Sequence, residues 1–105
     1  MTVQFADGAW PGDIGDGLAM TDEAFDVVEP LIQRTVPSWT SMHRYGVFEL
    51  ASLARSALAN TFRSKAEEYR RADRELQPEA EMLEELATWL EARSNQLEPV
   101  SVLGY

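Results

Sequence analysis

Hydrophobic residues recur at helical spacing in three stretches of the chain, and the first stretch follows a helix-start signal. Thr21 is a suitable N-cap, and Asp22 and Glu23 come next, where the helix dipole favours acidic residues. Pro30 lies inside the pattern and would remove one helical hydrogen bond, so we expect either a kinked helix or two short helices, ending by Pro37. The apolar residues at helical spacing are Phe25, Val28, Leu31 and Ile32.

The clearest helical pattern runs from about Tyr45 to Leu76. Its apolar residues fall in one arc of a helical wheel, and the opposite side carries Arg63, Arg70 and Arg74. Pro78 then begins a third helix at the first-turn position that proline favours. The apolar stripe of this third helix consists of Leu83, Leu86, Ala87 and Leu90. Because the break between the two helices is short, we expect an antiparallel hairpin with the first helix packed across it.

The two ends of the chain show an alternating pattern instead. Thr2 to Phe5 alternates polar and apolar residues, and Val100 to Leu103 is similarly rich in β-branched residues, as is typical of short strands. Two strands alone are marginally stable, so we expect at most a short β ribbon between the termini. The predicted fold class is therefore mainly α: a small bundle of three or four helices with a long central helix and a helical hairpin.

A chain of 105 residues is expected to form one domain. We divide it into a Gly/Asp-rich N-terminal arm (residues 1–20), a helical domain (21–98) and a C-terminal tail or short strand (99–105). The arm contains Asp7, Asp13 and Asp16, and carboxylates are ligands that calcium prefers, but their spacing does not match an EF-hand loop. The chain has no cysteine, which excludes disulfides and thiolate metal sites. We predict no metal and no cofactor.

Acidic residues dominate the charge, and they are unevenly distributed. The net charge is −9, and six of the nine basic residues lie between residues 46 and 76, so each flanking segment carries about −5. Such a chain repels nucleic-acid phosphates, so the expected partner is another protein, one with a basic surface. We expect no membrane partner, because no run approaches the roughly 20 apolar residues of a span. The first residues do not resemble a secretory signal, so we expect a cytoplasmic protein.

His43 is the only histidine and the only candidate for acid–base catalysis. Glu49 is close enough in sequence to orient it if the loop folds back, but no Gly-x-Ser-x-Gly motif surrounds a nearby serine. We therefore predict that the chain is not an enzyme. A second hypothesis makes His43 and Arg44 an anion or ligand site, because they come just before a predicted helix N-terminus.

Three residues of the last helix are the best candidates for a partner-binding surface. Met82 and Trp89 lie beside its leucine stripe, and Arg93 continues their line. Trp, Met and Arg are enriched in the centres of protein interfaces. Trp39 and Tyr45, in the loop around His43, are added as aromatic candidates for the same role, although such residues more often cover a core.

The sequence thus predicts a non-catalytic, acidic helical protein-binding module. An inhibitor, immunity protein or antitoxin that covers a basic site on its partner is one form of such a module, since it needs complementary shape and charge and no chemistry. A self-associating structural or accessory subunit, with a homodimer as its simplest form, is the alternative. A small enzyme that uses His43 is the third hypothesis.

Overall fold

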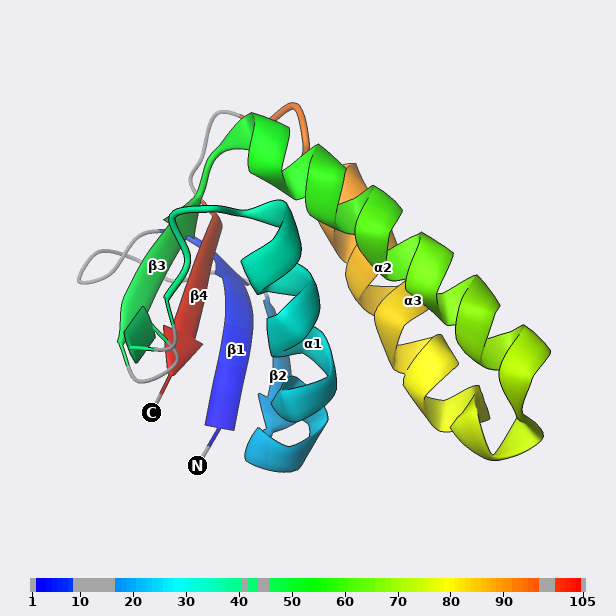
Figure 1. The fold of residues 1–105 in the computed structure, drawn as a ribbon. Helices are drawn as coiled ribbons and strands as arrows, with labels where there is room; N and C mark the ends of the chain where they lie inside the picture. Colours follow the sequence, from blue (N-terminus) through cyan, green and yellow to red (C-terminus); the bar gives the residue numbers. More distant parts are fainter. Residues whose placement is uncertain (1, 9–16, 41, 44–45, 97–99, 105) are drawn as a thin grey trace.

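The described residues form one antiparallel sheet and three α-helices, which makes this an α+β protein (Figure 1). The computed structural model describes residues 2–8, 17–40, 42–43, 46–96 and 100–104. The predicted mainly-α bundle is wrong, because four strands pair into a single sheet that supplies one side of the core. The two ends of the chain do pair with each other, but as the centre of this sheet and not as an isolated ribbon.

The strands are β1 (Thr2–Asp7), β2 (Gly17–Thr21), β3 (Val47–Leu50) and β4 (Val100–Gly104). Their order across the sheet is β2-β1-β4-β3, and every neighbouring pair is antiparallel. Phe5 sits opposite Leu18 on one side and Val102 on the other, so these side chains share the face that the helices cover. The predicted N-terminal arm of residues 1–20 therefore contains all of strand β1 and all of β2 except its last residue.

The second predicted helix begins later than expected, because its first residues form β3. Phe48 and Leu50 turn towards the core and pair with Val102 and Val100, while the intervening Glu49 is exposed. Helix α2 (Ser52–Ala72) starts only after this strand. Four residues are too few for apolar spacing to distinguish a strand from the first turn of a helix, and pairing with β4 decides the outcome here.

The other two helices begin where their start signals in the sequence predict. Helix α1 (Asp22–Thr35) is capped by Thr21, whose Oγ1 accepts a hydrogen bond of 3.2 Å from the amide of Ala24. Pro30 lies inside this one continuous helix, so the alternative of two short helices is wrong. Helix α3 (Gln77–Ala92) carries proline in its first turn, and a short 3₁₀ turn, η2 (Arg74–Leu76), joins it to α2.

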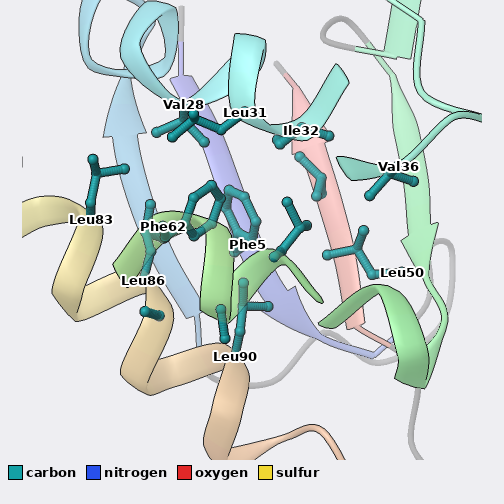
Figure 2. Close-up of a cluster of buried hydrophobic side chains, with 14 of the residues drawn as sticks. Phe5, Val28, Leu31, Ile32, Val36, Leu50, Phe62, Leu83, Leu86 and Leu90 are labelled. Atoms are coloured by element: carbon teal, nitrogen blue, oxygen red, sulfur yellow. The ribbon is translucent and has the colours of Figure 1, made fainter. Parts of the chain in front are cut away.

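The core lies between the sheet and the three helices (Figure 2). Phe5 of β1 and Phe62 of α2 meet edge to face at its centre, with ring centroids 6.5 Å apart. The predicted stripes of the first and third helices surround this pair and are buried: Phe25, Val28, Leu31 and Ile32 from α1, and Leu83, Leu86, Ala87 and Leu90 from α3.

Ion pairs join the two helices of the hairpin on its outer surface. Arg63 of α2 pairs with Glu91 of α3, and Arg70 pairs with Glu84, with a second contact of 2.8 Å between Arg70 Nη2 and Glu84 Oε2. The arginine face predicted on the second helix is therefore partly neutralised by acidic residues of the third.

Candidate groove between α3 and β2

A shallow groove of about 590 Å³ lies between the outer side of α3 and the edge strand β2. Among the described residues, β2 contributes Leu18 to its lining, and α3 with its C-terminal cap contributes Glu81, Glu84, Glu85, Thr88, Trp89, Ala92 and Arg93. A smaller depression of about 70 Å³ shares Leu18 and Glu85 with it and adds Met20 and Met82. We call the two together the α3–β2 groove.

Helical spacing explains how these side chains come to one surface. The core stripe of α3 faces inward, and Glu81, Glu85 and Trp89 follow each other at four-residue intervals on the adjacent face. Trp89 and Met82 are half-buried because each packs against the edge of the core while the rest of its surface lines the groove. Both residues therefore contribute to the core and to the groove.

Arg93 fixes the C-terminal end of the groove. Its guanidinium carbon lies 4.0 Å from the centroid of the Trp89 ring, and its Nε donates a hydrogen bond of 2.9 Å to Asp7 Oδ1. Gln96 Nε2 donates to the same carboxylate oxygen at 2.8 Å. The charge of Arg93 is thus neutralised by Asp7 of β1, and the guanidinium held there packs on the Trp89 ring. Asp7 is engaged in this ion pair, while Asp13 and Asp16 lie outside the described residues.

The wall of the groove is negative. Glu84 is tied to Arg70, whose hydrogen bond lowers the pKa of that carboxyl group and keeps it ionised. Glu81 accepts a hydrogen bond of 3.3 Å from Gln77 Nε2. Glu85 is exposed and makes no hydrogen bond or ion pair with another described residue. Because Arg93 is paired with Asp7 and Glu84 with Arg70, the carboxylates of Glu81 and Glu85 set the sign of the local field.

The structure separates Trp39 from the other predicted binding residues. Trp39 is 5% exposed and belongs to the core, where its ring lies 5.2 Å from Phe48 and 6.0 Å from Phe25. Its Nε1 donates a hydrogen bond of 3.2 Å to Glu29. Met82, Trp89 and Arg93, in contrast, all border the α3–β2 groove. Arg44 and Tyr45 lie outside the described residues.

His43 packs against aromatic rings. Its ring centroid lies 4.7 Å from Phe48 and 5.5 Å from Trp39, and its Nδ1 accepts a hydrogen bond of 3.0 Å from the amide of Thr40. Glu49 follows Phe48 in β3, so its side chain points to the opposite face of the strand and cannot orient His43. The geometry of the described residues thus brings no carboxylate from β3 to this histidine.

The helix N-terminus expected just after His43 and Arg44 lies further along the chain, and Arg44 is outside the described residues, so the anion-site hypothesis stays a prediction. Helix α2 begins at Ser52, and β3 separates its first turn from His43. Among the described residues, no group of three or more histidines and carboxylates is placed to hold a metal ion. Glu79 Oε2 is buried without a hydrogen-bond partner in the described structure, in a separate depression that Met82 also borders.

Sequence reasoning missed Leu18, the groove glutamates and Arg55. Leu18 and Met20 alternate with small or polar residues after Gly17, a signal that could have identified β2. Glutamates on the outer side of an amphipathic helix are common, so those of α3 gave no signal of a groove. Arg55 is 4% exposed and donates hydrogen bonds to the carbonyls of Leu50, at 2.9 Å, and Arg93, at 3.0 Å, so it joins the end of β3 to the end of α3.

No protein-family model, no curated protein and no solved structure matches this chain. None of the described helices combines the length and apolar character that crossing a bilayer requires. The interpretation of the groove therefore depends on its own residues and their geometry.

Proposed function

We propose that this chain is a cytoplasmic, non-catalytic protein-binding module, and that its α3–β2 groove binds a basic segment of a partner protein. The observation that carries the proposal is a half-buried tryptophan, Trp89, held in place by Arg93 beside a wall of glutamates. Tryptophan is among the residues that most often dominate binding energy. An inhibitor, immunity protein or antitoxin that covers a basic site is the form of this function that we favour.

The fixed orientation of Trp89 supports binding. Immobilising a side chain on association costs free energy, and the cation–π contact with Arg93 restrains this ring before a partner binds. The carboxylates beside it would attract a basic partner and select its orientation. This attraction is screened beyond about 8 Å at physiological salt, so the rate of association should fall as salt rises.

Affinity capture with matched baits tests the proposal. The full chain, its Glu85→Lys variant and a Glu75→Lys control are used as baits in extract of the organism that encodes the chain. Glu85 borders the groove, whereas Glu75 is exposed in η2, so both variants make the same change in net charge. We expect a basic protein that the parent and the control retain and the groove variant loses, with binding then measured between purified components. Equal retention by all three baits would contradict the proposal.

Self-association is the second candidate, favoured by the surface near β3. This strand lies at the other edge of the sheet, and Val47 within it is 41% exposed. Met42 before the strand and Leu53 after it are 82% and 87% exposed, and exposed apolar groups mark an interface most clearly next to a strand edge that, like this one, pairs with no other described strand. Light scattering over a concentration series tests this: a dimer that Leu53→Asp disrupts would favour self-association over the groove proposal.

A further inference from the structure

We infer that the partner segment binds in an extended conformation, as a fifth strand on the free edge of β2, with alternate side chains entering the α3–β2 groove. This inference rests on the proposed function and specifies its binding mode. The segment would carry lysine or arginine at two successive groove-facing positions and an apolar side chain at the next.

Among the described residues, no strand pairs with the second edge of β2. In the described structure β2 pairs only with β1, through all five of its residues, from Thr21 opposite Thr2 to Gly17 opposite Ala6. The other edge of a paired edge strand presents backbone donors and acceptors that an incoming strand can satisfy. A fifth strand would lie about 4.8 Å beyond β2.

The groove lies on the helix side of this edge. Leu18 and Met20 point to the core face of the sheet and border the groove together with side chains of α3. Side chains of an added strand alternate between the two faces, so every second one would project towards α3. The groove would therefore contact only half of the bound side chains.

The spacing of the groove residues fits this alternation. Glu81, Glu85 and Trp89 are separated by four residues each, which is a rise of about 6 Å along a helix. Alternate side chains of an extended strand are about 6.7 Å apart. Two basic side chains and one apolar side chain on the same face of the added strand can thus meet two carboxylates and the tryptophan in turn.

A bound helix fits these features less well. A helix is about 10 Å across with its side chains, so it would cover the shallow groove from outside and leave the β2 edge unpaired. An extended segment would form hydrogen bonds with the backbone of the β2 edge, and alternate side chains of that segment would fill the groove. The combination of a strand edge with a charged groove directly beside it favours the extended form.

Short peptides test the inference with the full chain labelled with ¹⁵N. The probe is a capped peptide, Val-Thr-Lys-Thr-Lys-Thr-Val, which presents two lysines and two valines on one face, so that two lysines are followed by a valine whichever way it runs. We expect NMR shift changes at the amides of Leu18 and Met20 and at the indole of Trp89. A peptide of the same composition in the order Val-Val-Lys-Lys-Thr-Thr-Thr lacks the alternation and should bind about tenfold more weakly.

Backbone methylation distinguishes strand addition from side-chain docking. One probe is N-methylated at its lysines and a second at its threonines, because only alternate amides of an added strand point towards β2. We expect one of these peptides to lose binding and the other to stay within a few-fold of the parent peptide. Unchanged binding by both, or no binding by the parent peptide, would overturn the inference.

The matched charge variants separate this inference from the proposed function. Glu85→Lys should weaken binding of the parent peptide about tenfold, whereas Glu75→Lys should leave it nearly unchanged. If both methylated peptides bind and Glu85→Lys still weakens them, the groove is a binding site for side chains and only the strand mode is wrong. If Glu85→Lys has no effect on any peptide or captured protein, the groove itself is not the site.

Discussion

Arg93 lies over the ring of Trp89, and the same guanidinium is bonded to Asp7 at the end of β1. The two partners of Arg93 come from the last helix and the first strand, and Asp7 is 86 positions away in sequence. This arrangement joins the C-terminal end of α3 to the sheet and orients the tryptophan that borders the groove. The contacts of Arg93 are therefore expected to contribute both to the stability of the fold and to the shape of the proposed binding surface.

Replacing Arg93 tests that coupling. Arg93→Ala removes the cation–π contact and leaves Asp7 with one fewer donor, so it should lower the free energy of unfolding by about 1–2 kcal/mol. The fluorescence of Trp89 should also shift, because its ring loses a fixed neighbour. Arg71→Ala, whose side chain is 80% exposed, serves as the control and should change stability by less than about 0.5 kcal/mol. Equal effects of the two changes in chemical denaturation would contradict this role.

Replacing Gly17 tests how closely β1 and β2 approach, and Gly46 provides the control. A Cβ added at Gly17 would lie 2.2 Å from the carbonyl oxygen of Phe5, which is too close for the strand pair to accept without moving. Gly17→Ala should therefore cost about 1–3 kcal/mol of stability. A Cβ at Gly46 meets nothing within 4 Å, so Gly46→Ala should be neutral or slightly stabilising. The comparison is measured by thermal and chemical unfolding, and unchanged stability of the Gly17 variant would contradict this pairing of β2 with β1.

Replacing Leu86 tests the packing of the third helix, and the exposed Leu53 of α2 provides the control. Leu86 is 1% exposed in the core, so Leu86→Ala should lower stability by roughly 2–5 kcal/mol. Leu53 is 87% exposed, and the same change there should cost less than about 0.5 kcal/mol. A melting temperature that Leu86→Ala leaves unchanged would show that α3 does not pack on the sheet as described.

The helices could be predicted from the sequence because their signals are local. Thr21 caps α1, proline begins α3, and both apolar stripes are buried as their spacing predicts. The sheet could not be predicted in the same way. Its central pair joins β1 to β4 at opposite ends of the chain, and its edge strands are only four and five residues long. Such strands are decided by long-range pairing more than by local preference.

The helical side of the groove was predictable because helical spacing is a local signal, whereas its strand side was not. Met82, Trp89 and Arg93 could be placed on one side of α3 from helical spacing alone, and the structure brings them to the groove. Leu18 and Asp7 could not be assigned to that surface, because their positions depend on strands that the sequence did not clearly predict. Whether these residues bind a partner stays a prediction.

The ion pair between Arg70 and Glu84 predicts a specific pH dependence. The hydrogen bond from Arg70 holds the pKa of Glu84 below its ordinary value, so the folded protein releases this proton more readily than the unfolded chain. The contribution of the pair to stability is then complete above the unfolded pKa of glutamate and is lost as pH falls through the lower, folded pKa. Glu84→Gln should thus lower the melting temperature at neutral pH, and the difference from the parent should vanish in acid.

Glu75→Gln provides the control for this pH series. Glu75 is exposed in η2 and forms no ion pair with another described residue, so its replacement should change the melting temperature little at any pH. An NMR titration of the Glu84 carboxyl group measures the lowered pKa directly, and Arg70→Gln should raise that pKa back towards its ordinary value. A melting-temperature difference for Glu84→Gln that persists unchanged in acid would mean that the carboxylate contributes through packing and not through its charge.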